Sequence, residues 1–190
     1  MPIVQNLANE DIRMINERMI IGLIDGFILK IQRPNHAADA FYCGRPGKCY
    51  DGLNIQYMTD FQGKIRHIVT GISGRAHDRN AIEWCRRFRL WLDALPDNYF
   101  VLGDSAYVGF HPKLLTIHRN PQNNAQRDFN REARLLRVSI ENVIGANECI
   151  WRLIMSKENR LPTKSGINLS CNIVISAAVL HNRFTNYVRP

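Results

Sequence analysis

The sequence predicts an α/β fold in which a mixed central sheet is flanked by helices. Three apolar runs with strand character come first, and a fourth follows later. Between the third and fourth runs, apolar residues recur at helical spacing over residues 81–95. A hairpin pairs its strands antiparallel, whereas a strand beyond a helical connection commonly runs parallel to its neighbour. The sheet is therefore expected to be mixed.

The first half of the chain is expected to hold the first three strands. Residues 1–18 are expected to form an arm or a short helix, and residues 19–31, MIIGLIDGFILKI, a buried strand. Residues 33–48 are rich in turn formers and basic residues, which indicates a loop. Residues 50–59 and 65–72 have the pattern of two hairpin strands joined by a short polar turn.

A helix over residues 81–95 opens the second half. Asn80 and Glu83 resemble a capping box at its start, and Pro96 ends it. Residues 98–110 return to strand character.

Two long helices complete the expected domain. A polar loop over 117–125 leads to a helix over 127–150, and the last helix covers 168–186. Residues 19–188 are therefore expected to form one domain. The order of three strands, a helix, a strand and further helices is that of a ribonuclease H-like fold. The pattern by itself leaves that fold as one α/β option among several.

Composition narrows the class of partner. The chain has 190 residues and a net charge of +8, which favours nucleic acid first and an acidic membrane surface second; a merely solvated basic surface is the alternative. No apolar run is long enough to cross a membrane, and no signal-peptide pattern is visible. The five cysteines form no C-x-x-C pair, which indicates reduced thiols inside a cell.

Two aspartates lie in apolar runs where a charge is costly. Apart from two glycines, the residues from Met19 to Leu29 around Asp25 are all apolar, and Asp104 follows an apolar run and Gly103. Two like charges do not compensate each other. If the two strands are neighbours, a divalent cation between the carboxylates is the economical solution, and oxygen ligands suit Mg²⁺ or Mn²⁺.

Glu141 is the candidate for a third ligand. On the long helix, Arg134, Arg137, Glu141 and Gly145 share one face beside an apolar face. Glu141 would then lie where the helix meets the sheet, with Gly145 allowing a close approach. An exposed Glu141 that pairs with Arg137 is the alternative, and the helical spacing alone favours it.

Ordered motifs along residues 19–186 resemble a known family, the nuclease domain of PIF/Harbinger-type transposases. The resemblance extends to the domesticated Harbinger transposase-derived nucleases, which are DDE superfamily endonucleases. The motifs that carry it are Gly22-x-x-Asp25-Gly26, Asn54-x-Gln56, Gly74-x-x-His77-Asp78, Leu102-Gly103-Asp104-Ser105-x-Tyr107, then Asn130, Arg137, Glu141 and Gly145, and finally Leu180-His181-Asn182.

The resemblance implies a ribonuclease H-like fold with a D-D-E triad formed by Asp25, Asp104 and Glu141. It implies a metal-dependent endonuclease that cleaves DNA phosphodiester bonds with two divalent ions, Mg²⁺ or Mn²⁺. The same triad serves hydrolysis and DNA strand transfer. The resemblance also implies DNA as the partner and the nucleus as the location.

Further residues have an auxiliary role or a structural one. His77 and Asp78 would assist the site, or Asp78 would cap the helix that follows. Tyr42, Tyr50 and Tyr107 would stack on splayed bases, or pack in the core. A group of basic residues would contact DNA phosphates, unless each is only a solvated charge: Arg45, Lys48, Arg75, Arg134 and Arg137.

The sequence departs from the family pattern in ways that favour a second function. Glu148 stands where the family usually has a basic residue, and Phe27 where Thr is common. About twenty residues precede the first strand, where family members usually carry a DNA-binding region. A separate DNA-binding targeting protein is therefore an expected partner. The alternative to an active nuclease is a domesticated, catalytically idle module that binds DNA or protein.

Overall fold

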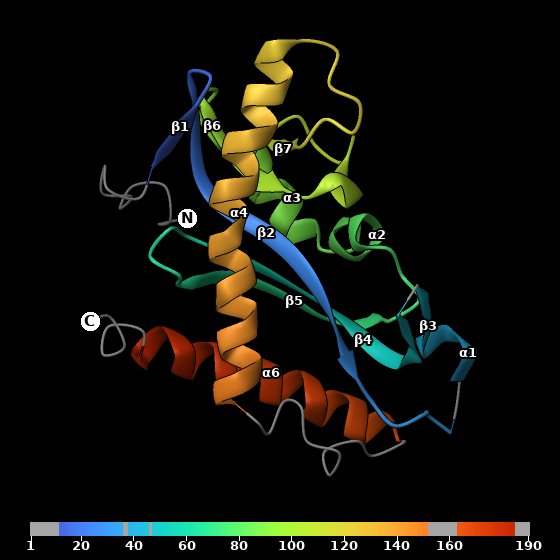
Figure 1. Ribbon diagram of the computed structural model, residues 1–190. Coiled ribbons are helices and arrows are strands. Elements are labelled where there is room, and N and C mark those ends of the chain that lie inside the picture. Colours follow the sequence, from blue (N-terminus) through green and yellow to red (C-terminus); the bar gives the residue numbers. More distant parts are fainter. Residues whose placement is uncertain (1–11, 36–37, 46, 152–162, 185–190) are drawn as a thin grey trace.

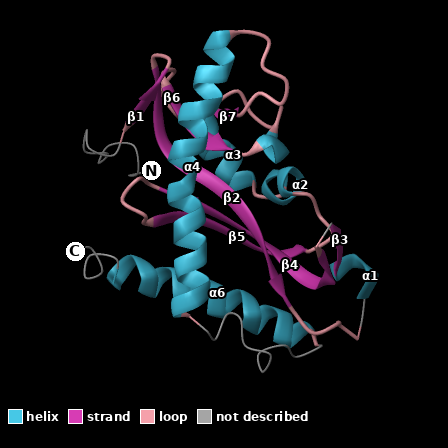
Figure 2. Cartoon of the chain, viewed as in Figure 1, coloured by secondary structure: helices cyan, strands magenta, loops and turns pink. Residues whose placement is uncertain are grey.

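A computed structural model of the chain describes residues 12–35, 38–45, 47–151 and 163–184 (Figure 1). The described residues form one seven-stranded mixed sheet, with helices around it (Figure 2). This confirms the predicted mixed α/β architecture. The strands are β1 (Arg13–Ile15), β2 (Arg18–Lys30), β3 (Tyr42–Arg45), β4 (Lys48–Thr59), β5 (Ile65–Ser73), β6 (Tyr99–Gly103) and β7 (Leu114–Thr116). The helical elements are α1 (Ala38–Phe41), α2 (Asp78–Glu83), α3 (Arg86–Asp93), the 3₁₀ turn η2 (Ser105–Tyr107), α4 (Asn124–Ile150) and α6 (Lys164–Phe184).

Strands β2 and β4 form the centre of the sheet. β4 pairs antiparallel with β2, with β5 and, at its N-terminal end, with β3. β2 pairs parallel with β6 on the side away from β4, and β7 is parallel to β6. β1 pairs antiparallel with the first residues of β2, on the edge opposite β6. Leu23 of β2 lies opposite Leu102 of β6. Asp25, in the middle of β2, and Asp104, just beyond the end of β6, therefore lie at the same level of two adjacent parallel strands.

Both faces of β2 are covered, which explains its nearly continuous apolar run. On one face, Leu23 and Phe27 pack into clusters that include residues of α4 and α6. On the other face, Ile21 and Ile24 pack with residues of α2 and α3. Figure 1 shows α4 crossing in front of β2, with α6 running below it. The strand thus forms the middle layer of the domain.

The segment before β2 differs from the expected arm or short helix. Arg13–Ile15 forms β1, which pairs with the start of β2. Asn16 and Glu17 make the turn with positive φ values of 46° and 65°. Ile15 is buried, so the packing of one apolar side chain decides the local structure. Residues 1–11 lie outside the described residues.

The loop predicted over 33–48 also contains regular structure. Helix α1 and strand β3 lie within it, and β3 pairs with β4 through Tyr42 opposite Asp51 and Cys43 opposite Tyr50. The prediction was wrong because the strand is short and is stabilised by its partner rather than by its own apolar pattern.

The single helix predicted over 81–95 is two helices, α2 and α3, which are separated at Trp84 and Cys85. Trp84 is exposed, whereas Ile82 and Phe88 pack in the same core cluster. The apolar period continues across the break because both helices cover one face of the sheet. The predicted capping box is wrong too, because His77 is the N-cap and Asn80 lies inside α2.

The other elements follow the prediction with shifted ends. The hairpin is confirmed as β4 and β5, and the two long helices as α4 and α6; residues 185–186 of the last predicted helix lie outside the described residues. The strand predicted over 98–110 ends at Gly103, because Asp104 caps the 3₁₀ turn η2. The three-residue strand β7 was not predicted. Among the described helices, none is long and apolar enough to span a membrane.

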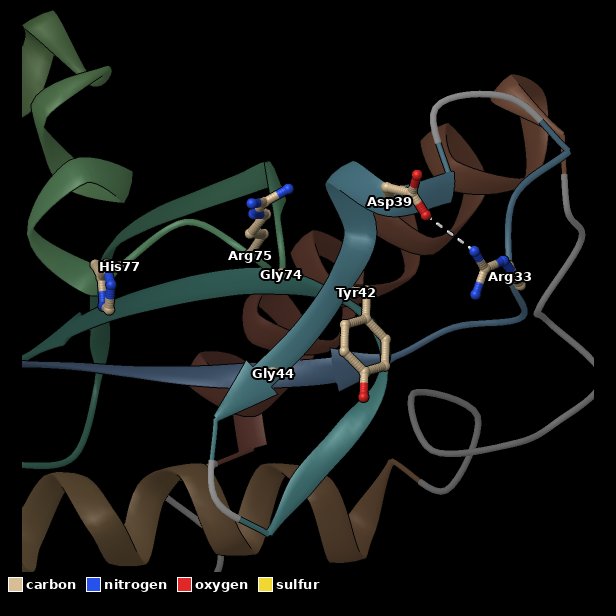
Figure 3. Close-up of a pocket in the computed structure, with 7 residues that line it drawn as sticks. All are labelled: Arg33, Asp39, Tyr42, Gly44, Gly74, Arg75 and His77. Carbon is tan, nitrogen blue, oxygen red and sulfur yellow. Dashed lines mark hydrogen bonds and ion pairs between the residues drawn. The ribbon is translucent and has the colours of Figure 1, made fainter.

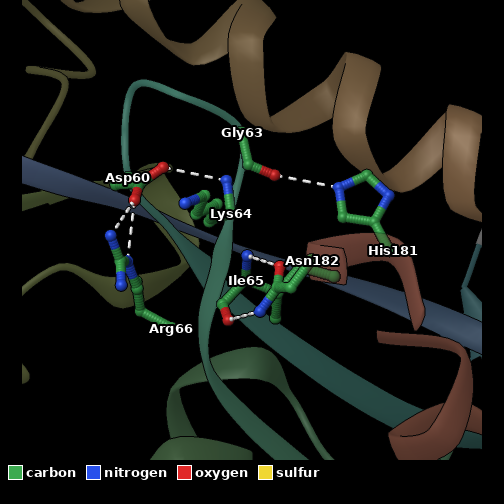
Figure 4. A network of polar contacts seen from close by, with 7 residues as sticks. All are labelled: Asp60, Gly63, Lys64, Ile65, Arg66, His181 and Asn182. Atoms are coloured by element: carbon green, nitrogen blue, oxygen red, sulfur yellow. Dashed lines mark hydrogen bonds and ion pairs between the residues drawn. The ribbon is translucent and has the colours of Figure 1, made fainter. Parts of the chain in front are cut away.

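Two side chains near the end of α6 hold it to the β4–β5 hairpin (Figure 4). Asn182 bonds both backbone groups of Ile65: its Oδ1 accepts from the N–H at 2.7 Å and its Nδ2 donates to the carbonyl at 2.7 Å. His181 Nε2 lies 2.9 Å from the carbonyl oxygen of Gly63. His181 and Asn182 of the motif Leu180-His181-Asn182 thus have a structural role, because they fix the start of β5.

We expect Asn182→Ala to lower the free energy of unfolding by roughly 2 kcal/mol, since two part-buried backbone groups lose their partner. Arg183→Ala, on the exposed neighbouring residue, should change it by less than about 0.5 kcal/mol. Urea denaturation measures both values. Equal effects of the two substitutions would show that the Asn182 contacts do not stabilise the fold.

Candidate active site

Asp25 lies on the face of β2 that α4 covers, and its side chain is only 18% exposed. Its Oδ1 accepts the backbone N–H of Gly26 at 2.9 Å, and its Oδ2 lies 3.1 Å from Nη2 of Arg137. Burial raises the pKa of Asp25 to about 6, although Arg137 and the Gly26 N–H act in the opposite direction. The neighbouring charge of Asp104 raises this pKa further. The carboxylate is therefore only partly compensated.

Asp104 reaches the same place from the adjacent strand. It stands two residues after Leu102, as Asp25 stands two residues after Leu23, and these two leucines are register partners. Asp104 is half-buried, and its Oδ1 accepts the backbone N–H of Ala106. The structure thus brings together the two aspartates that the sequence singled out.

Glu141 lies on α4, one turn after Arg137, and its side chain is 56% exposed. Its Oε1 is 3.6 Å from the same Nη2 atom that contacts Asp25. Arg137 therefore bridges Asp25 and Glu141. A side chain at Gly145 would meet no atom within 4 Å, so the predicted close approach there is wrong.

The donor set fits a divalent cation in part. Asp25 and Asp104 supply hard oxygen ligands on neighbouring strands, and they repel each other. Across the described ranges, however, no group of three His, Cys, Asp or Glu side chains is placed to hold a metal ion. Arg137 lies between Asp25 and Glu141 and supplies the positive charge there. Glu141 would have to leave Arg137 to complete the triad.

A buried polar network lies on the opposite face of the sheet. Asn54 Nδ2 and Gln56 Nε2 donate to Oδ1 of Asp78 at 2.9 and 3.1 Å. The Tyr107 hydroxyl donates to Oε1 of Gln56, and Gln56 also donates to Asn54. Sequence reasoning identified these residues only as family motifs. The sequence did contain a sign of this network, because Asn54 and Gln56 alternate with apolar residues in a strand that is buried on both faces. Buried polar side chains of this kind need hydrogen-bond partners.

Gly26 connects the network to Asp25. A Cβ atom on Gly26 would lie 2.4 Å from Nε2 of Gln56 and 2.9 Å from Oδ1 of Asp78. Only glycine lets the amide approach the strand so closely. Burial, followed by the charges of Asp78, Asp25 and Asp104, raises the pKa of Tyr107 well above its usual value. The Tyr107 hydroxyl therefore lies near the carboxyl groups of all three aspartates.

The remaining predicted residues occupy varied positions. Asp78 is the first residue of α2 and accepts bonds from the network, while His77 is exposed at the N-cap. Arg75 and Arg134 are exposed, whereas Arg137 is only 14% exposed. The side chains of Arg45 and Lys48 lie outside the described residues.

The three tyrosines considered for base stacking also differ. Tyr107 is fully buried, so base stacking by Tyr107 is excluded. Tyr50 is half-buried with the ammonium of Lys30 5.4 Å from its ring centre. Tyr42 is exposed.

The raised pKa of Asp25 predicts a pH-dependent stability in the absence of divalent ions. The folded protein binds the Asp25 proton more tightly than the unfolded chain, whose ordinary value is 3.8. This contribution is fully present below pH 3.8 and is lost as the pH rises through about 6. The Asp25→Asn variant has no titrating carboxyl group at this position, so its stability does not lose this contribution. Its stability relative to the unsubstituted protein should therefore rise by up to about 3 kcal/mol between acid and neutral pH.

Urea denaturation in a chelating buffer over that pH range measures this difference. A difference that stays constant with pH would contradict the raised pKa.

Comparison with known proteins identifies the family of this fold and site. No curated protein and no solved structure matches the chain. A family model described as DDE superfamily endonuclease matches residues 24–182. That span contains Asp25, Asp104 and Glu141, together with the buried polar network. Since the match covers most of the 190 residues, the chain belongs to the DDE superfamily of endonucleases.

Proposed function

We propose that the protein is a metal-dependent DNA endonuclease of the Harbinger transposase type. One observation carries the proposal: Asp25 in the middle of β2 lies level with Asp104 just beyond the end of the adjacent parallel strand β6, and Arg137 links Asp25 to Glu141. Membership of the superfamily supports a transposase-derived nuclease domain, to which we assign residues 19–188.

The sheet topology supports a ribonuclease H-like fold for this domain. β2, β4 and β5 form an antiparallel meander, and β6 and β7 join the free side of β2 in parallel. α2 and α3 form the connection from β5 to β6. The predicted order of elements is thus present, and it sets Asp25 on the central strand.

Each residue of the triad has a proposed role. Asp25 and Asp104 would hold a divalent cation, Mg²⁺ or Mn²⁺, and Glu141 would be the third ligand. When bound, such ions lower the pKa of an attacking hydroxyl group and stabilise the leaving oxygen. The hydrogen-bonded side chains of Gln56 and Asp78 lie against the backbone of Gly26, and they thereby fix β2 next to Asp25. Hydrolysis and strand transfer would use the same residues.

DNA is the proposed substrate, and its phosphates suit a chain with a net charge of +8. Arg134 is exposed on α4 one turn before Arg137, where it could contact a phosphate near the triad. Nuclear location and a separate targeting protein stay predictions from the resemblance.

A catalytically idle module on the same fold is the competing function. The observation in its favour is Arg137, because the protein's own guanidinium already pairs with Asp25 and Glu141. Such a module would bind DNA or protein without cleaving a phosphodiester bond.

Nicking of supercoiled plasmid tests the proposed function. We expect the purified protein to nick DNA with Mg²⁺ or Mn²⁺, and Asp104→Asn to reduce the rate by at least about 100-fold, since a metal-ligand carboxylate is lost. Asp128→Asn, on an exposed carboxylate of α4, is the matched control and should retain activity. A chelator should abolish nicking. Metal binding without any nicking would favour the idle module instead.

Arg137 and a metal ion should compete for Asp25. Without metal, Arg137→Ala should cost roughly 2 kcal/mol of unfolding free energy, because a part-buried carboxylate loses its partner. The same variant should show a larger rise of melting temperature on adding Mn²⁺ than the unsubstituted protein. Arg134→Ala, one turn away and exposed, is the control. An identical metal response in all three proteins would exclude the competition.

A further inference from the structure

A surface pocket of about 700 Å³ lies beside the polar network, between β3 and the connection from β5 to α2 (Figure 3). It is lined by two arginines and one carboxylate, together with an aromatic ring, an imidazole and two glycines: Arg33, Arg75, Asp39, Tyr42, His77, Gly44 and Gly74. Pockets of this volume hold small organic ligands. The mixture of an aromatic ring and cationic groups indicates a ligand with a flat ring and a negative charge.

Close backbone packing holds the pocket in shape. A Cβ atom on Gly74 would lie 2.5 Å from the carbonyl oxygen of Gly52 and 2.9 Å from that of Phe41. The Gly74 N–H donates to the Gly52 carbonyl at 2.8 Å, and the Ser73 hydroxyl donates to the Ala40 carbonyl. The segment that carries Tyr42 is therefore fixed against the segment that carries Arg75. The pocket is formed before any ligand binds.

The charge of the pocket favours an anion. Arg75 is exposed and makes no ion pair within the described ranges of the chain. Arg33 pairs with Asp39 at 3.0 Å, but the side chains are 59% and 90% exposed, so this pair is weak. A phosphate could therefore bind Arg75 directly and draw Arg33 away from Asp39 at little cost.

Tyr42 supplies an open aromatic face. Its residue is 40% exposed on β3, and Gly44, two positions later on the same side of the strand, has no side chain to cover the ring. A nucleobase can stack on such a ring only where its own face is uncovered, as in a single strand. A base on Tyr42 and its phosphate on Arg75 would together make one nucleotide.

Contacts through the sheet connect the pocket to the backbone next to Asp25. His77 precedes Asp78, and Asp78 accepts a bond from Gln56, whose amide lies against Gly26, next to Asp25. We propose that this pocket, here called the nucleotide pocket, binds one unpaired nucleotide of the DNA substrate. Tyr42 stacks on the base and Arg75 contacts the phosphate. The inference rests on the proposed function for the identity of its ligand, and its test requires no cleavage.

Fluorescence anisotropy of a labelled oligothymidine strand of about twelve nucleotides, in a chelating buffer, tests this site. Tyr42→Ala and Arg75→Ala should each weaken binding by at least about fivefold, whereas Tyr42→Phe should stay within about twofold because it keeps the ring. Arg131→Ala, on an exposed arginine of α4, is the matched control and should also stay within about twofold. Weakening by Arg131→Ala equal to that by Arg75→Ala would overturn the pocket as the site.

A strand with abasic positions separates base from phosphate. The unsubstituted protein should bind it as weakly as Tyr42→Ala binds the intact strand, and Tyr42→Ala should cause no further loss. Arg75→Ala should still weaken binding of the abasic strand, because this strand keeps its phosphates. If Tyr42→Ala weakens duplex binding as much as single-strand binding, recognition of an unpaired base is overturned.

The proposed function can fail separately, since nicking can be absent while these binding effects remain. Conversely, nicking that depends on Asp104 together with unchanged binding of the Tyr42→Ala and Arg75→Ala variants would overturn only the nucleotide pocket.

Discussion

The charge of Asp25, held on the central strand of the sheet, is the constraint on which the site depends. A carboxylate that is 18% exposed needs a partner, and the nearest cation comes from α4, more than one hundred residues later in the chain. The contact between Arg137 and Asp25, together with the buried apolar residues Ala133 and Ile140 of α4, holds this helix in one rotation over the sheet. Because Glu141 lies one turn beyond Arg137, the same rotation brings the third carboxylate of the triad toward the first two.

The opposite face of the sheet meets the same need with neutral groups. Asn54, Gln56 and Tyr107 surround the Asp78 carboxylate with donors or with groups that orient donors, and all three are buried. Since a buried polar network is stable only when its members are satisfied, it specifies one position for the start of α2. Gly26 lets this network reach the backbone beside Asp25. The sheet is therefore rigid on both sides of the point where the carboxylates lie.

The features that the sequence could predict are those that depend on residues close together in the chain. Asp25 and Asp104 stand out because charges in apolar runs are rare, and their pairing follows from the order of the strands. The strand β3 and the break at Trp84 escaped prediction because a partner strand and a shared core decide them. The bridge made by Arg137 was also out of reach, since helical spacing pairs it with Glu141 but says nothing of Asp25. Side chains that meet across the fold leave no periodic trace.

The two candidate functions differ in which cation neutralises Asp25. Arg137 carries one positive charge and divides it between Asp25 and Glu141, so the repulsion between Asp25 and Asp104 remains. A divalent ion between the two aspartates would remove that repulsion and release Arg137 for Glu141 or for a DNA phosphate. Burial raises the pKa of Tyr50 and Tyr57, and the charge of Glu148, the departure that favoured an idle module, adds to both shifts. Glu148 is not among the groups that shift the pKa of Asp25. The repulsion between the two aspartates is therefore the observation that supports the proposed metal-dependent enzyme over the idle module.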